Sequence, residues 1–580
     1  MNSKLALGIV SLLLLSTVWY DYEFFSTTWV NTGEYSPCDQ FVKEGGIRNL
    51  YQGQPYCKQG PVLYVLQYFI EMVFGSAFRT VLVSLFVIIG IHLYYLLRKS
   101  VKAKELLLMV LFFITFIAFA RSLNALLATY AFFSGYYFLF TSTHKWSKIF
   151  AGIFFALALH VKINTLFALG LVILYYLFKH FENGKLRINL KDKFFISLLV
   201  SLIVLFFLWP NYYMYNLYAL SQVNPGERGI FDAFAGLTDL IRNIHARSIF
   251  IISIFIGSLA SLALARTFPA VIALIFSLIM YITDYRITGT AAVLHVHYYL
   301  PIFPFFIMAL IALYEKTSRK QKIAYCIALA FLLSTAISTI QAEKDSHEVQ
   351  KTLLDIYKDI PSQPGKILVQ ENSYHNERMK GFEDEKFEKL PDRKHYPVAH
   401  FDGWYEQGLV KLGYVNLSEW YVDTPQEIYD DYANKIRNGT YSLMLLGPPE
   451  WIKLTEVVQQ AASKEMKTQY CQIILPDLTY ISSNGRHDVQ LFFADQNDCK
   501  TLLQRTNDYY QKNFNNICKK SPLVANDIVK PTLQREGITI SETCTQTKDK
   551  LLYWDSQAFY VSPIIFLISL AILFYIYKRQ

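Results

Sequence analysis

The residues Trp19-Tyr-Asp-Tyr-Glu-Phe-Phe25 close an apolar run over residues 5–20 and place two acids, Asp21 and Glu23, where that run ends. No lysine or arginine follows until Lys43. A run of this length predicts a helix that crosses a lipid bilayer, which takes about 20 residues. A carboxylate is costly to desolvate at the point where such a helix leaves the lipid. The two acids therefore indicate either an interfacial helix end or a functional group.

Similar apolar runs recur through residues 1–340 and return once near the C-terminus, in a chain of 580 residues that is 53% hydrophobic. This pattern predicts an α-helical polytopic membrane domain at 1–340, an extracytoplasmic soluble domain at 341–557 and a C-terminal anchor at 558–580. The absence of a small-residue cleavage site before Asp21 favours a retained first helix over a signal peptide. We expect about 12 spans, at residues 4–20, 79–97, 105–120, 124–141, 147–160, 164–178, 194–209, 248–265, 268–283, 298–314, 323–340 and 558–577.

The basic residues indicate how these spans are oriented. With a cytoplasmic N-terminus, the inner loops hold 18 Lys and Arg, whereas the short outer turns hold one each, at Arg121, Lys162 and Arg286. Because cytoplasmic loops collect Lys and Arg, Asp21 and residues 341–557 should lie outside. The net charge of +9 then reflects topology and not a nucleic-acid partner. We expect the plasma (inner) membrane with both termini cytoplasmic, or the endoplasmic reticulum membrane in a eukaryote.

The cysteines agree with this orientation, since Cys326 falls in an expected span and the other six fall in outer segments: Cys38, Cys57, Cys471, Cys499, Cys518 and Cys544. Even numbers in each outer segment favour disulfides in an oxidising compartment. Cys38–Cys57 would close the first outer loop, whereas the four later cysteines can pair in three ways. A zinc site is the weaker interpretation, because close C-x-x-C spacing is missing.

The expected outer domain has an alternating pattern. Residues 366–370 and 441–446 predict short buried strands, and residues 425–437 and 454–467 have helical spacing, which indicates an α/β fold. Near the first span, residues 62–74 predict a helix that lies at the outer interface. The chain has no Walker motif, no dinucleotide-binding glycine pattern and no G-x-S-x-G.

Cations recur at the outer ends of the expected spans, at Arg121, Lys162, Arg242, Arg247 and Arg286. Each alone is explained by a long side chain reaching the headgroups. Clustered together, they would form an anion-binding pocket that faces the carboxylate of Asp21. That arrangement suits transfer from a lipid phosphate, because cations hold the leaving phosphate while the carboxylate deprotonates the incoming hydroxyl.

The order of these features resembles the GT-C superfamily of membrane glycosyltransferases. The resemblance is carried by Asp21, by L-Y-x-G-x-P-Y-C-x-Q-G-P-V-L-Y at 50–64, R-S-L-N-A-L-L-A-T at 121–129, L-H-V-K at 159–162 and H-V-H-Y-Y-L-P at 295–301. The resemblance covers residues 1–340. These stretches are similar to those of bacterial and archaeal mannosyltransferase-like members, which use polyprenyl-phosphate sugars.

This resemblance implies an inverting, one-step transfer with Asp21 as general base and Glu23 as its companion. It implies donor-phosphate binding by Lys162, Arg121, Arg247, Arg286 and His297, and substrate binding by Tyr51, Tyr56, Gln59 and Asn124. The acids form D-x-E instead of the D-D or D-E of many members, so either acid could be the base. A divalent metal stays open, and no metal ligand is assigned.

The implied partners are a polyprenyl-phosphate sugar donor, a glycan, lipid or protein acceptor and the lipid bilayer, with no nucleic acid. Two other classes share several of these features. A lipid-linked oligosaccharide ligase or polymerase would have similar outer loops, but it typically uses paired arginines and no early acid. A transporter or sensor with an outer binding domain needs no acid in the first loop and should have helices broken near the membrane midplane.

Overall fold

The computed structural model describes residues 3–20, 61–74, 78–101, 105–119, 123–182, 185–186, 192–208, 246–288, 296–337, 366–370, 419–421, 426–446, 470–476, 488–520, 524–540, 566–571 and 573. The chain divides into two compact units. One unit, called here the helical unit, comprises Met1–Val30, Phe41–Thr339 and Phe559–Gln580. The other, called here the sheet unit, comprises Asn31–Gln40 and Ile340–Ala558.

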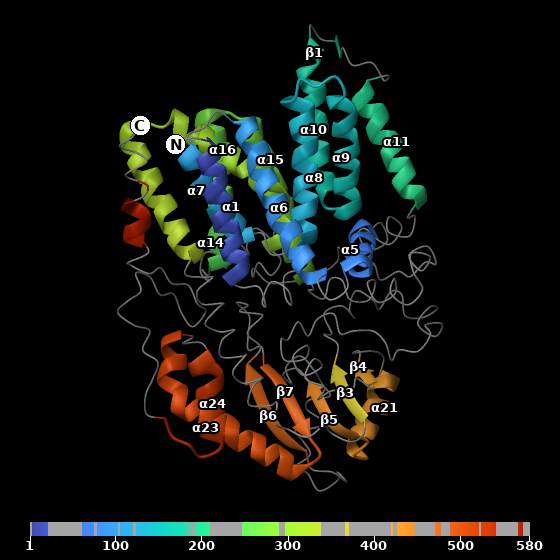
Figure 1. Ribbon diagram of the computed structural model, residues 1–580, viewed down its shortest axis with the longest axis vertical. Coiled ribbons are helices and arrows are strands. Elements are labelled where there is room, and N and C mark those ends of the chain that lie inside the picture. Colours follow the sequence, from blue (N-terminus) through green and yellow to red (C-terminus); the bar gives the residue numbers. More distant parts are fainter. Residues whose placement is uncertain are drawn as a thin grey trace. The chain divides into compact units, whose positions relative to one another are not determined.

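The helical unit consists of long apolar helices that pack side by side (Figure 1). Its described helices are α1 (Ser3–Tyr20), α5 (Pro61–Phe74), α6 (Phe78–Ser100), α7 (Glu105–Phe119), α8 (Leu123–Phe140), α9 (Ser147–Val161), α10 (Thr165–Lys179), α11 (Lys193–Leu208), α14 (Ala246–Ala265), α15 (Phe268–Thr288), the 3₁₀ helix η3 (Val296–Ile302), α16 (Phe303–Lys316) and Arg319–Ile337.

Helices therefore lie where the first eleven spans were expected, and the helix predicted at residues 62–74 is α5. Within the described residues, Tyr299–Lys316 and Arg319–Ile337 have the length and composition to cross a membrane. Shorter apolar stretches, of 10–17 residues, lie within further helices, among them Leu5–Leu15, Ala125–Phe140 and Ile249–Ala265. Helical structure at these positions is thus confirmed, whereas their crossing of a bilayer stays a prediction.

Charges placed at helix ends shape the hairpin of α6 and α7. Arg98 lies in the last turn of α6 and Glu105 in the first turn of α7. Each charge is stabilising there, because it is opposite in sign to the partial charge at that end of its helix. The two side chains form an ion pair across the turn, and the Tyr94 hydroxyl donates to Glu105 (3.3 Å). These charged residues thus mark the C-terminal end of α6 and the N-terminal end of α7.

Aromatic rings set the antiparallel register of α8 and α9. Tyr130 contacts Phe154 with 6.4 Å between ring centroids, and Phe138 contacts Phe150 at 5.4 Å, so the two helices run in opposite directions. Next to the first of these contacts, Phe132 packs on Phe155 at 5.1 Å. Phe132 also packs on Phe305 of α16 at 5.8 Å. The core of the helical unit is therefore built from interlocked rings, which fix both rotation and register of the helices.

The close approach of α9 and α11 depends on Gly152. A Cβ atom at this position would lie 2.5 Å from the backbone nitrogen of Leu198 and 2.9 Å from the carbonyl oxygen of Phe194. The Ser197 hydroxyl donates to the carbonyl of Ile149 (2.7 Å) and closes the same contact. Small residues at helix contacts allow such close backbone packing in membrane proteins.

The helix expected from residue 298 begins differently from the prediction. Residues Val296–Ile302 form the 3₁₀ helix η3, and α16 starts only at Phe303. Pro301 lies inside η3 and Pro304 lies in the first turn of α16. Because proline has no backbone N–H, it fits these positions and would break the interior of a regular α-helix. The expected inner loop at 179–193 also contains an unforeseen hairpin of β1 (Phe181–Glu182) and β2 (Lys185–Leu186).

The sheet unit is built around a five-stranded mixed sheet. Its strands are β3 (Lys366–Gln370), β4 (Glu419–Tyr421), β5 (Tyr441–Leu446), β6 (Cys471–Pro476) and β7 (Asp488–Phe493), in the order β4-β3-β5-β7-β6. Strand β3 pairs parallel with β4 and β5, whereas β7 pairs antiparallel with β5 and β6. Helix α21 (Gln426–Arg437) precedes β5, and α23 (Gln496–Lys520), η9 (Val524–Val529) and α24 (Lys530–Arg535) follow β7.

The strands predicted at residues 366–370 and 441–446 and the helix predicted at 425–437 are confirmed, with the helix beginning at Gln426. Gly439, at φ 69°, ends this helix in the left-handed conformation that favours glycine. The helix expected at 454–467 lies outside the described residues.

A disulfide joins Cys471, at the start of β6, to Cys499 in the first turns of α23. This bond is one of those that the sequence left open among the four later cysteines. Cys518 is also disulfide-bonded, whereas Cys326 is a buried free thiol. Cys38, Cys57 and Cys544 lie outside the described residues.

Candidate functional site

Lys162 is buried at the point where the chain leaves α9. Its side chain is only 8% exposed, and its backbone has the extended conformation, with φ −147° and ψ 109°. Its N–H still donates to the carbonyl of Ala158, so Lys162 ends the helix. An ammonium group removed from water is costly unless negative charge or hydrogen bonds compensate. Lys162 stands at the carbonyl end of α9, where the partial negative charge of a helix favours a cation.

The connection from α9 to α10 is short and held by hydrogen bonds. The Thr165 hydroxyl donates to the carbonyl of Lys162 (2.9 Å), and the Thr165 N–H donates to the same oxygen (3.1 Å). The Asn164 amide reaches the sulfur of Met280 on α15 (3.7 Å). Lys162 is therefore positioned by three helices, since this turn joins α9 to α10 and contacts α15.

Asn124 lies at the same level as Lys162. The contacts Tyr130–Phe154 and Phe138–Phe150 define an antiparallel register between α8 and α9, because the residue numbers fall along α9 as they rise along α8. Continued to the helix ends, that register brings position 124, in the first turn of α8, opposite position 162. Two of the residues expected from the sequence to bind substrate and donor therefore share one end of the helical unit.

The elements that carry the other expected donor-binding residues reach the same end. Tyr175 stacks on Phe268 (3.6 Å between centroids), so that α10 and α15 run antiparallel and Arg286 comes in the last turn of α15. Phe255 contacts Tyr281 (6.2 Å), which brings the start of α14, with Arg247, beside the end of α15. Helix η3, which contains His297, packs against both α8 and α15.

Several expected site residues lie outside the described residues: Asp21, Glu23, Tyr51, Tyr56, Gln59 and Arg121. The structure therefore gives their sequence positions and nothing more. Their assigned roles stay predictions.

Buried polar residues that were not assigned from the sequence surround this end of the unit. His160, in the last turn of α9, is fully buried, and Tyr281 of α15 and Tyr299 of η3 are nearly so. His160 stands two residues before Lys162 within the L-H-V-K motif, and this proximity was the available signal. Polar groups are rarely buried in an apolar bundle without a structural or functional partner.

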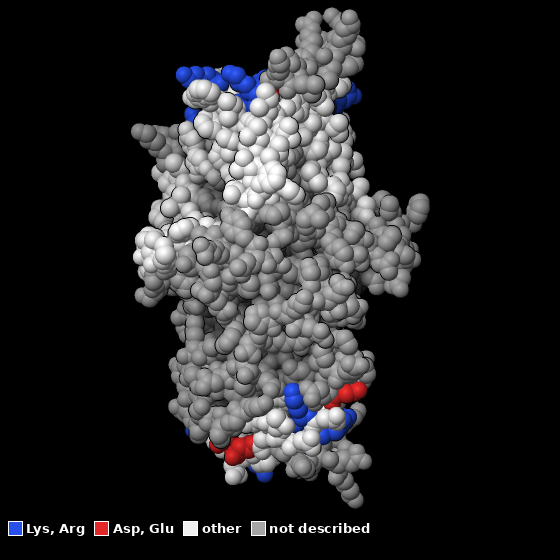
Figure 2. Space-filling model, turned by 90° about the vertical axis from the view of Figure 1, so that its right-hand side faces the viewer, with Lys and Arg blue, Asp and Glu red and all other residues white. Residues whose placement is uncertain are grey.

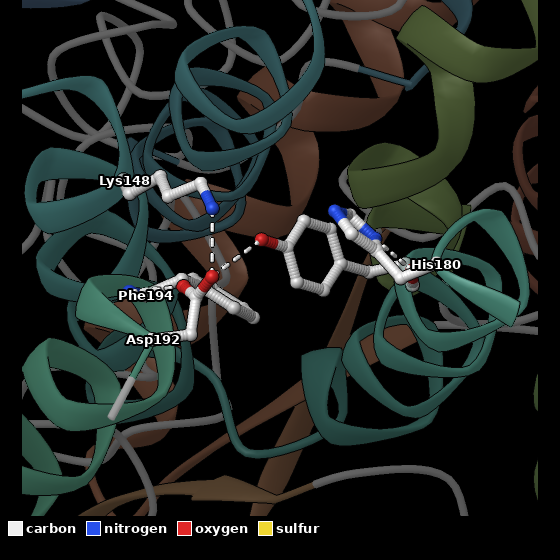
Figure 3. Close-up of polar contacts among 5 residues, drawn as sticks. Lys148, His180, Asp192 and Phe194 are labelled. Atoms are coloured by element: carbon white, nitrogen blue, oxygen red, sulfur yellow. Dashed lines mark hydrogen bonds and ion pairs between the residues drawn. The ribbon is translucent and has the colours of Figure 1, made fainter. Parts of the chain in front are cut away.

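A second polar cluster lies at the opposite end of α9 (Figure 3). Lys148 donates to Asp192 (2.7 Å), and Asp192 also accepts from the Tyr176 hydroxyl (3.1 Å) and from the N–H of Phe194 (2.9 Å). Partial burial would raise the pKa of Asp192, but the hydrogen bonds from Lys148 and Phe194 outweigh it and hold this pKa below its ordinary value. The cluster joins α9, α10 and α11 through hydrogen bonds and an ion pair, and its role is best explained as structural.

The described residues contain no group of three or more His, Cys, Asp or Glu that could hold a metal ion. Comparisons of the chain with protein-family models, with curated proteins and with solved structures found no match.

Proposed function

We propose that the chain is a polytopic membrane glycosyltransferase that moves a sugar from a polyprenyl-phosphate donor to a cell-envelope glycan, lipid or protein acceptor. The observation that carries the proposal is the buried ammonium of Lys162, level with Asn124 at the end of the bundle where the sequence expects the donor. A fixed cation of this kind is suited to a lipid phosphate, which must be held where the membrane meets water.

The surface of the helical unit supports a lipid environment. Phe178 and Phe207 are each 76% exposed, and further large apolar side chains on α10 and α11 are exposed beside them. Soluble proteins rarely expose contiguous apolar surface on this scale. Figure 2 shows Lys and Arg gathered at one end of this unit, above a face where the described residues are uncharged. That distribution is typical of a membrane domain whose basic end faces the cytoplasm.

The chemistry is a single displacement. The Asp21 carboxylate takes the proton of the acceptor hydroxyl, and the acceptor oxygen forms a bond to the anomeric carbon of the sugar. The bond from that carbon to the phosphate oxygen breaks, and polyprenyl phosphate leaves with the bonding electrons. Lys162 and the nearby arginines stabilise the charge that develops on the leaving phosphate. The anomeric configuration is inverted.

The disulfide Cys471–Cys499 supports an extracytoplasmic location for the sheet unit, because such bonds persist in oxidising compartments. We assign the reaction to the same side of the membrane. The sheet unit is then available to the acceptor, in the plasma membrane or, in a eukaryotic cell, in the endoplasmic reticulum.

The test uses the purified full chain in nanodiscs with radiolabelled polyprenyl-phosphate sugars and an envelope extract as acceptor. We expect label to appear in the acceptor and polyprenyl phosphate to be released in equal amount. Transfer only from a diphosphate-linked oligosaccharide would indicate a ligase instead. Release from none of the donors tested, with protein that binds them, would contradict the proposal.

A further inference from the structure

An exposed aromatic and basic surface lies at the end of the helical unit opposite Lys162. We call it the Trp146 surface and define it as His144, Lys145, Trp146 and Lys193. The Trp146 ring is 45% exposed, and two ammonium groups share it: Lys145 Nζ is 5.7 Å and Lys193 Nζ 5.9 Å from its centroid. The α8–α9 connection and the start of α11 thus bring two cations to one indole, at a distance typical of cation–π contacts.

The Trp146 surface is held in place by the cluster of Figure 3. Lys148 follows Trp146 by two residues, and Asp192 directly precedes Lys193. Lys148 and Asp192 form an ion pair of 2.7 Å. The backbone N–H of Trp146 also donates to Nδ1 of His144 (3.3 Å), which orders the α8–α9 connection. The relative position of Lys145 and Lys193 is therefore fixed by contacts beneath them and does not require a ligand.

The Trp146 surface keeps its positive charge. Asp192 directs its carboxylate to Lys148, Tyr176 and the N–H of Phe194. Among the described residues, Lys145 and Lys193 contact aromatic rings and form no ion pair. Lys179 adds a further cation on the neighbouring helix α10, where it lies 5.2 Å from the ring of Tyr175. An anion that approaches this end meets several fixed cations.

Exposed apolar side chains adjoin these cations. The Phe150 ring is 39% exposed and lies 6.2 Å from the ring of His144. Ile196, one helical turn after Lys193 on α11, is 46% exposed. A free phosphate ion would use only the cations, whereas an amphiphile would use both parts of this surface. The arrangement is that of basic sites which bind lipid headgroups at the cytoplasmic side of membrane proteins.

We propose that the Trp146 surface binds the phosphate headgroup of an anionic phospholipid, with an acyl chain along Phe150 and Ile196. The inference rests on the membrane placement in the proposed function but not on the proposed reaction. Lys145 and Lys193 contact the phosphate, and the Trp146 ring lies at the level of the headgroups, where tryptophan is enriched.

The experiment measures lipid binding to the full chain in a non-ionic detergent by native mass spectrometry. Phosphatidylglycerol and phosphatidylcholine with identical acyl chains are titrated separately, and inorganic phosphate is added in a third arm. We expect preferential binding of phosphatidylglycerol and no competition by millimolar phosphate. In the double variant Lys145→Gln/Lys193→Gln, affinity for phosphatidylglycerol should fall roughly 25-fold, at about fivefold for each cation removed.

Lys320→Gln/Lys322→Gln is the matched control, because it removes the same charge from the first turn of the helix Arg319–Ile337, which follows α16. We expect it to retain phosphatidylglycerol binding at the wild-type level, and Lys145→Arg/Lys193→Arg to retain most of it. Size-exclusion profiles verify that each variant is folded. Equal losses in both glutamine variants would reduce the effect to net charge and overturn the proposal, as would unchanged binding in Lys145→Gln/Lys193→Gln. Competition by inorganic phosphate with phosphatidylglycerol would show that the surface binds a free anion, and it would also overturn the proposal.

Discussion

Lys162 illustrates how a single residue joins the sequence to the proposed chemistry. The sequence marks it only as one cation at the outer end of an expected span, where reaching the headgroups would suffice to explain it. The structure instead buries its side chain at the end of α9, and Thr165 holds its backbone by two hydrogen bonds. A buried lysine is a far more specific feature than a surface one, because its desolvation must be compensated.

We predict that Lys162→Met weakens binding of a polyprenyl-phosphate sugar roughly 10- to 100-fold, as expected for the loss of a hydrogen bond to a charged group. Equilibrium binding of a labelled donor in nanodiscs measures this. Lys148→Met is the matched control, since it removes a lysine from the other end of the same helix. Equal donor affinity in Lys162→Met and the wild type would show that Lys162 does not bind the donor.

Asp192 provides a prediction with a pH dependence. Its pKa is lowered in the folded protein, so its contribution to stability is present above the ordinary carboxyl pKa of about 4 and is lost as the pH falls through the lowered value. Because Lys148 is partly exposed, we expect Asp192→Asn to cost only about 0.5–1 kcal/mol at pH 7. The difference in melting temperature from the wild type should shrink as the pH falls below about 4. A difference that grows on acidification would contradict the assigned ion pair.

At the scale of elements, the α9–α11 contact depends on the missing side chain at position 152. We predict that Gly152→Ala destabilises the helical unit by about 1–3 kcal/mol or more, because its Cβ would overlap the backbone of α11. Gly170→Ala is the control, since a Cβ there has no atom within 4 Å. That variant should be neutral or slightly stabilising, because alanine favours the helix. Thermal unfolding in detergent compares the two, and equal melting temperatures would contradict the contact.

Most helices could be predicted from the sequence, whereas several of their ends could not. Long apolar runs and charged ends determine α6 and α7, and the strand at residues 441–446 is visible as a short apolar run. The 3₁₀ start of α16 was missed because hydropathy does not register the two prolines. The L-H-V-K motif shows that His160 lies close to Lys162, but its burial arises from packing between helices and is not visible in the sequence.

For the whole molecule, the proposed topology requires that the two ends of the helical unit face different compartments. We predict that, in intact cells after reduction, an impermeant thiol reagent labels Cys471 and Cys499, identified by peptide mass spectrometry. In a Lys145→Cys variant, the new thiol should be labelled only after permeabilisation. The reverse pattern would invert the topology and with it the proposed side of the reaction.

We propose that Asp21 is the general base of the sugar transfer. The measurement is transfer from a polyprenyl-phosphate sugar by the purified wild type, Asp21→Asn and Glu23→Gln, with donor binding recorded in parallel. Removal of a general base typically costs about 10²- to 10⁴-fold in rate. We predict a loss of this size in Asp21→Asn, nearly unchanged donor binding, and a smaller loss in Glu23→Gln. Transfer by Asp21→Asn at the wild-type rate would show that the acid only marks the end of the first helix, and the proposed mechanism would be wrong.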